Sequence, residues 1–127
     1  MADAIVASDQ PSEVGVPLSP GDVVWAALDP ARGREQAGHR PALVVASGGY
    51  LDAVTMLAIV LPVTTVDRGW PNHIRLSGPS VGLAEPSWAM TEQPRTIVRG
   101  RITARAGRVD ADCLAQARQW LADFFDL

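Results

Sequence analysis

The sequence predicts one small, mainly β domain: a strongly curved sheet or barrel with a helix packed on it. Three observations predict it. The chain has 127 residues, a length typical of a single domain that buries a core without covalent staples. Short apolar runs rich in β-branched residues alternate with loops that contain Gly and Pro. The last segment changes to helical spacing.

The first elements follow from local composition. Residues 1–19 mix Ala, Ser, Asp, Pro and Gly without a period, which predicts a flexible tail ahead of a folded domain over 20–127. The turn at 19–22 leads into a strand over 23–28. After a loop, Pro41 precedes a second strand over 42–47, a place where proline is tolerated.

The middle of the chain predicts the core of the sheet. Gly-Gly-Tyr at 48–50 indicates a turn, and the long apolar run 53–65 indicates a central strand. Pro62 predicts a bend or an edge near the end of that strand. Residues 73–77 alternate polar and apolar, as a half-buried strand does, with His73 on its solvated face.

The last third predicts short strands and the helix. A strand over 87–93 would place Trp88, Met90 and Glu92 on one face, and further strands are expected near 96–98 and 101–104. The residues that recur at helical spacing are Leu114, Ala117, Leu121 and Phe124 or Phe125. Asp110 can cap the N-terminus of this helix.

Residue counts exclude several classes of protein. The single cysteine, Cys113, rules out an intrachain disulfide, and with only His39 and His73 besides, we expect neither a structural metal site nor a cofactor. No apolar run has the length of a membrane span, and no secretory signal is visible. These features indicate a cytoplasmic protein.

Charge is distributed unevenly along the chain. The net charge is −3, which argues against a simple cationic nucleic-acid binder. Residues 21–109, however, carry ten arginines against seven acids, while both ends are acidic. Arginine makes bidentate contacts that match phosphate geometry, so the locally basic centre is compatible with a phosphate-containing ligand.

One loop concentrates hydrogen-bond donors. The stretch LDPARGREQAGHRPALVV spans 28–45 and carries Arg32, Arg34, Glu35, Gln36, His39 and Arg40. The chain has no P-loop, no Gly-x-Ser-x-Gly elbow and no histidine pair at metal spacing. Cys113 has no histidine near it in sequence, which makes a thiol nucleophile a poor choice. The remaining residue types suit electrostatic handling of phosphate.

Three stretches carry a resemblance to a known family. GDVVWAALDPARGREQAGHRPALVV, LPVTTVDRGWPNHIRLSG and TEQPRTI resemble, in order and spacing, the MazF/PemK (Kid) toxins of bacterial toxin–antitoxin pairs. The likeness spans about Gly21 to Ile102. It implies an SH3-like half-barrel of the CcdB/Kid/MazF type with a C-terminal helix, working as a homodimer. It also implies a metal-independent, sequence-specific endoribonuclease for single-stranded RNA, with a MazE-like antitoxin as partner.

The resemblance assigns roles to particular residues. Arg40 would hold the scissile phosphate, Thr64 would donate its hydroxyl to a phosphate oxygen, and Glu35 would orient Arg40 or act as the base. The expected RNA-binding residues are Arg34, Gln36, His39, Thr65, Arg68 and Trp70. Without the family, the residue types favour a structural ion pair for Arg40 and Glu35, and core or interface positions for Trp70 and Trp25.

The sequence departs from the Kid branch at two places, and two other functions are alternatives to the one that the resemblance implies. In the Kid branch a histidine occupies the place of Arg34, and an arginine and an aspartate occupy those of Met90 and Glu92, so the Kid set of catalytic residues is not intact. One rival is a protein-binding gyrase poison like CcdB, which typically ends in Trp-Gly-Ile; the ending Phe-Phe-Asp-Leu counts against it. The other rival is a catalytically silent RNA-binding regulator.

Overall fold

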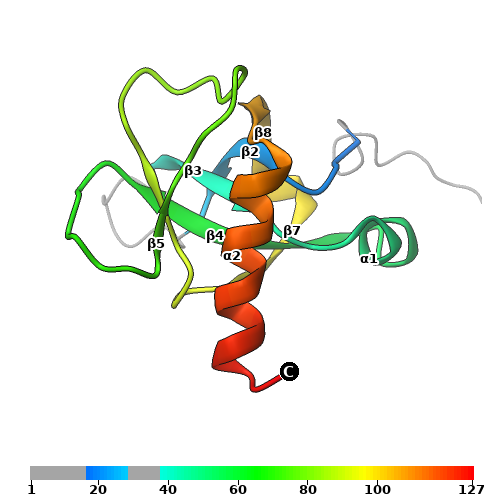
Figure 1. Ribbon diagram of the computed structural model, residues 1–127. Helices are drawn as coiled ribbons and strands as arrows, with labels where there is room; N and C mark the ends of the chain where they lie inside the picture. Colours follow the sequence, from blue (N-terminus) through cyan, green and yellow to red (C-terminus); the bar gives the residue numbers. More distant parts are fainter. Residues whose placement is uncertain (1–16, 29–37) are drawn as a thin grey trace, which may run out of the picture.

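A computed structural model describes residues 17–28 and 38–127 and contains a seven-stranded, open antiparallel sheet (Figure 1). The strands are β2 (Asp22–Ala27), β3 (His39–Val44), β4 (Leu57–Thr64), β5 (His73–Arg75), β6 (Trp88–Met90), β7 (Arg95–Val98) and β8 (Ile102–Arg108). Their order is β5-β6-β4-β3-β2-β8, with β7 also paired to β4. The predicted fold class, mainly β with a C-terminal helix, is confirmed. The predicted tail lies outside the described residues, apart from 17–19.

Strand β4 is the centre of the sheet and changes neighbours along its length. On one edge it pairs with β3. On the other edge Leu57–Val60 pair with β7, whereas Val63 and Thr64 pair with β6. Pro62 lies where this second edge passes from β7 to β6. A residue without an N–H is tolerated at such a position. The structure has a change of strand partner at Pro62, which also pairs with Ala42 of β3, where the sequence predicted a bend or an edge.

Side chains that alternate along the strands form two buried clusters. Val23, Leu43, Leu61 and Val63 pack with Cys113 and Ala117 of the C-terminal helix. Their neighbours Val24, Ala42, Val44 and Val60 pack on the other face with Leu51 and Ile97. Since successive side chains of a strand point to opposite faces, residues in step with Ala42 and Val60 belong to the face opposite the C-terminal helix.

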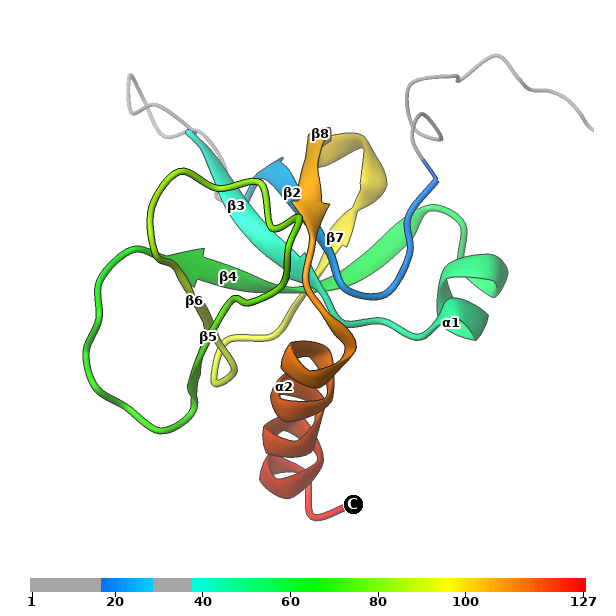
Figure 2. The same ribbon diagram turned by 45° about the horizontal axis from the view of Figure 1, so that its top comes forward.

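The C-terminal helix, α2 (Ala111–Phe124), begins where predicted. The Asp110 side chain accepts a hydrogen bond from the backbone N–H of Cys113, which caps the first turn. The sequence predicts Phe124 or Phe125 on the buried face, but the two side chains are 49% and 65% exposed, because the end of α2 projects beyond the sheet (Figure 2). No helix in the described part of the chain is both long and apolar enough to cross a membrane.

Several predicted boundaries were wrong. Residues 48–50 belong to a short helix, α1 (Gly48–Ala53), because the Ser47 hydroxyl caps it and Leu51 is buried. β4 therefore begins at Leu57. β5 and β6 are shorter than predicted, and β8 is longer because it pairs along β2. The connections 65–72 and 76–87 extend at the end of the molecule away from α1 (Figures 1 and 2).

Candidate functional site

Arg40 and Thr64 lie on neighbouring strands and on the same face of the sheet. Arg40 pairs with Ala26 of β2, and Thr64, the last residue of β4, pairs with Trp88 of β6. Pairing between β3 and β4 ends at Ala42 and Pro62. If that register continued for two more residues, Arg40 would lie opposite Thr64, on the face opposite α2.

The hydroxyl of Thr64 is held in one orientation. Its oxygen accepts a hydrogen bond of 3.1 Å from the backbone N–H of Val66. One lone pair is therefore occupied, while the hydroxyl hydrogen has no acceptor among the described residues and can be donated to a ligand. The arrangement makes Thr64 a donor at the end of β4.

The other predicted site residues fall into two groups. Glu35, Arg34 and Gln36 lie outside the described residues, so their predicted roles stay predictions. The described ones are all exposed: His39 on β3 and Thr65, Arg68 and Trp70 in the 65–72 connection.

Trp70 is not a core residue. Its side chain is 49% exposed. The Arg68 guanidinium lies 5.9 Å from the centre of its ring, and the ring is tilted against His73 at 4.8 Å. A half-exposed indole beside a cation is a surface on which a nucleobase can stack.

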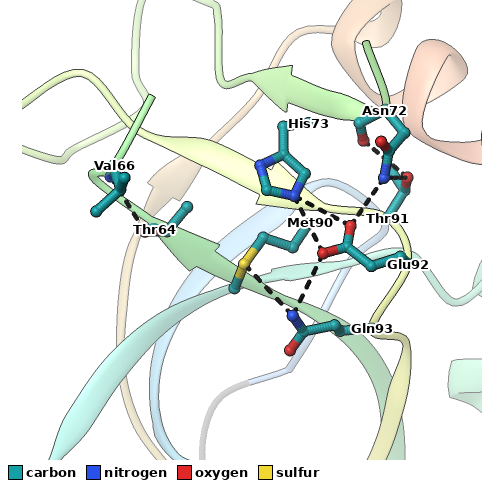
Figure 3. Close-up of polar contacts among 8 residues, drawn as sticks. All are labelled: Thr64, Val66, Asn72, His73, Met90, Thr91, Glu92 and Gln93. Carbon is teal, nitrogen blue, oxygen red and sulfur yellow. Dashed lines mark hydrogen bonds and ion pairs between the residues drawn. The ribbon is translucent and has the colours of Figure 1, made fainter. Parts of the chain in front are cut away.

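His73 differs from its prediction. The side chain is 2% exposed rather than solvated, because Trp70 packs on it and β6 lies beside it. Its Nε2 lies 3.1 Å from each carboxylate oxygen of Glu92 (Figure 3). A carboxylate only accepts, so Nε2 carries the hydrogen. Nδ1 is buried without a hydrogen-bond partner in the described part of the chain.

Further hydrogen bonds fix Glu92 and the end of the 65–72 connection. The Asn72 amide donates to Glu92 at 2.8 Å, and the Thr91 hydroxyl donates to the Asn72 carbonyl at 2.7 Å. Burial acts to raise the pKa of the Glu92 carboxyl, but the hydrogen bonds from His73, the backbone and Gln93, together with the electrostatic attraction of His73, hold the pKa below its usual value. The sequence placed Glu92 on a strand and gave no sign of its pairing with His73.

The arginines divide sharply by their contacts. Nine of the eleven lie in the described residues. Six of these contact backbone carbonyls or Asp22: Arg95, Arg99, Arg101, Arg105, Arg108 and Arg118. The remaining three, Arg40, Arg68 and Arg75, make no hydrogen bond or ion pair within the described residues. All three lie in β3, β5 or the connection that follows β4.

A groove of about 240 Å³ opens on the other face of the sheet from Arg40 and Thr64, because Trp25 and Pro41, which line it, are in step with Val23 and Leu43 of the cluster that packs on α2. Trp25 and Pro41, which are paired across β2 and β3, form one side, and Leu83 and Thr65 contribute to the rest. Trp25 is half-buried and borders this groove.

Cys113 is buried in the core beneath α2. Burial raises the pKa of its thiol, which disfavours a reactive thiolate at this position.

These features define a class of protein. Guanidinium groups without a hydrogen bond or ion pair among the described residues, a donor hydroxyl and the exposed indole of Trp70 gather at one end of an open antiparallel sheet. Cations combined with aromatic platforms are the recurrent surface of proteins that bind single-stranded nucleic acid. The site therefore belongs to a small β-sheet protein suited to that ligand.

Comparison with known proteins identifies the family. Residues 19–125 match the family of PemK-like, MazF-like toxins of type II toxin–antitoxin systems. The chain is 36% identical over 90 residues to the endoribonuclease toxin MazF of Escherichia coli K12, covering 70% of this chain and 77% of that one. It is also 36% identical over 112 residues to endoribonuclease MazF9 of Mycobacterium tuberculosis, covering 84% and 95%.

Solved structures agree with the sequence relatives. MazF of Deinococcus radiodurans superposes with a TM-score of 0.72 and 28% identity, over 88% of this chain and 99% of that one. The MazF chain of a MazE–MazF complex from the same organism gives 0.71 and 29%, over 88% and 98%. The chain belongs to the PemK-like, MazF-like toxin family, and the family resemblance read from the sequence is confirmed.

Proposed function

We propose that this toxin is a sequence-specific, metal-independent endoribonuclease that cleaves single-stranded mRNA and thereby inhibits growth. The observation that carries the proposal is the placement of Arg40, whose guanidinium makes no hydrogen bond or ion pair within the described residues, and of Thr64, an oriented donor hydroxyl, on neighbouring strands and on the same face of the sheet. The curated relatives named above are endoribonucleases, which favours cleavage of RNA over the gyrase-binding alternative.

The chemistry uses a nucleophile that RNA supplies. The 2′-hydroxyl loses its proton and attacks the adjacent phosphorus, the bond to the 5′-oxygen breaks, and that oxygen takes up a proton. The products are a 2′,3′-cyclic phosphate and a 5′-hydroxyl. Arg40, always charged, stabilises the negative charge that develops on the non-bridging oxygens, and Thr64 donates to one of them. Glu35 either orients Arg40 or accepts the 2′-hydroxyl proton.

The surrounding side chains would hold the RNA in place. Arg34, Gln36, His39 and Thr65 border the reacting phosphate in this proposal. Trp70 stacks on a base and Arg68 contacts the backbone. Holding the chain on both sides of the reacting phosphate lowers the entropic part of the barrier.

Two partners complete the proposed function. The D. radiodurans MazF is known bound to MazE, and we expect a cognate MazE-like antitoxin whose acidic segment folds across the basic end of the sheet. Phe124, Phe125 and Leu127 expose apolar surface at the end of α2, which suits an interface and supports a homodimer. The proposed place of action is the cytoplasm, where mRNA is translated.

One experiment tests activity, recognition and end chemistry together. A long RNA is incubated with the protein in EDTA, and the cut ends are mapped. We expect cuts at one short sequence with cyclic phosphate ends. A second RNA with a 2′-deoxy sugar at the cut site should bind but stay whole. A strict metal requirement, or cleavage of the deoxy substrate, would refute the proposed chemistry, and binding without cleavage of normal RNA would favour the silent regulator.

A further inference from the structure

Strand pairing extends the site beyond the residues predicted from the sequence. Thr64 of β4 lies directly opposite Trp88 of β6, and Trp88 lies directly opposite Arg75 of β5. Directly opposed residues share a face of the sheet. A row Thr64–Trp88–Arg75 therefore runs across three neighbouring strands on the face opposite α2, and it starts at the proposed catalytic hydroxyl.

The end of this row is a supported cation. The Arg75 guanidinium lies 5.6 Å from the centre of the Trp88 ring, within the range of a cation–π contact. Arg75 is exposed, and it makes no hydrogen bond or ion pair within the described residues. All of its hydrogen-bond donors remain available, while the indole limits the positions that the side chain adopts.

The separation between Thr64 and Arg75 fits two neighbouring phosphates of one RNA strand. Neighbouring strands lie about 4.8 Å apart, so Arg75, two strands away, begins roughly 10 Å from Thr64 along the row. Its long side chain reaches back over Trp88 and shortens that separation. A phosphate near Thr64 and another near Arg75 would then belong to one RNA strand that crosses β4, β6 and β5.

We propose that Arg75, supported by Trp88, binds a backbone phosphate of the RNA next to the cleaved one. The inference rests on the proposed endoribonuclease function and adds a binding position to it. Phosphate is favoured over a base because the exposed guanidinium presents several donors and only its indole-facing side is covered. This contact is independent of base identity and fixes the register of the strand on the enzyme.

The test measures binding and its salt dependence. The probe is an RNA of the mapped recognition sequence with a 2′-deoxy sugar at the cut site, titrated against Arg75→Gln at several salt concentrations. Loss of one phosphate contact should weaken binding about tenfold and reduce the slope of log K against log salt by about 0.7. Arg75→Lys should recover the slope, because it keeps the charge.

Arg105→Gln is the matched control. It removes the same charge from an exposed arginine on β8, at the other edge of the sheet, and Asp22 keeps its contact with Arg108. If Arg75→Gln binds like Arg105→Gln while wild-type protein cuts RNA, the inference is wrong and the proposed function stands. Weaker binding with an unchanged slope would also overturn it in favour of a base contact. If wild-type protein neither binds nor cuts RNA, the proposed function itself fails.

Discussion

Arg99 at one end of the sheet and Arg40 and Arg75 at the other end serve different purposes. Around β7 and α1, Arg99 donates to the carbonyls of Leu51, Val54 and Leu57 at 2.5, 3.3 and 2.9 Å. Its guanidinium therefore links α1, the residue that follows α1 and the start of β4. At the opposite end Arg40 and Arg75 project from strands without a hydrogen bond or ion pair to the described residues.

This difference separates structural cations from available ones. A guanidinium bonded to backbone carbonyls has fewer donors left for a ligand, and its removal takes a hydrogen-bond partner from those carbonyls. An exposed guanidinium contributes little to the folded state, but it provides donors in a fork that matches phosphate. The basic stretch 21–109 therefore contains two populations, and only one of them forms the candidate site.

Arg40→Ala should give the largest loss of activity. Removal of one group that stabilises the transition state lowers the cleavage rate by roughly 10²–10³-fold. The free energy of unfolding should change by less than about 0.5 kcal/mol, since Arg40 is exposed. Single-turnover cleavage of the mapped RNA measures the first quantity and urea denaturation the second. Cleavage at the wild-type rate would remove Arg40 from the site.

Thr64→Val should have a smaller effect of the same kind. It removes the donated hydroxyl and the oxygen that accepts from Val66, so we expect cleavage to slow by about 10- to 100-fold. Thr64→Ser is the matched control, because it keeps both functions of the hydroxyl. Equal rates for the valine and serine variants would show that this hydroxyl does not act on the phosphate.

Arg99→Met should lower stability and leave the chemistry intact. The substitution removes the hydrogen bonds that Arg99 donates to backbone carbonyls, so the free energy of unfolding should fall by about 1–3 kcal/mol. Arg101→Met, which removes one exposed contact to the Ala27 carbonyl, should cost less. Denaturant melts together with cleavage rates of the folded variants measure both effects. A large loss of cleavage without loss of stability would place Arg99 among the available cations instead.

Breaking the His73–Glu92 pair should give the smallest change in stability, and this change should depend on pH in the acidic range. The folded-state pKa of Glu92 is lowered, so its contribution to stability is present above the usual value of 4.5 and is lost as the pH falls through the folded-state pKa. Glu92→Gln should therefore be less stable than wild type at pH 6, by under about 1 kcal/mol, and this difference in stability should narrow as the pH falls below 4.5. Glu85→Gln, in an exposed loop, is the control. A gap independent of pH would exclude this linkage.

Much of the scaffold could be predicted because its signals are local. The Asp110 cap, the helical spacing of Leu114, Ala117 and Leu121, and the β-branched runs each act within a few residues. α1 was missed because its two glycines suggest a turn, whereas burial of Leu51 decides for a helix. The exposure of Phe124 was not predicted, because the sequence of the helix does not show how far the sheet extends beneath α2.

For the site, the sequence by itself determined which residue types are present and in what order. These are an arginine-rich loop, a threonine near the end of a proline-containing strand and a single cysteine, together with a family resemblance over most of the chain. Only the tertiary structure decided which arginines are available, that His73 is buried against Glu92, and that Thr64, Trp88 and Arg75 form one row. The physical reason is that residue type and spacing are local properties. Hydrogen-bond satisfaction and cross-strand neighbours depend on segments 10 or more residues apart meeting in a sheet.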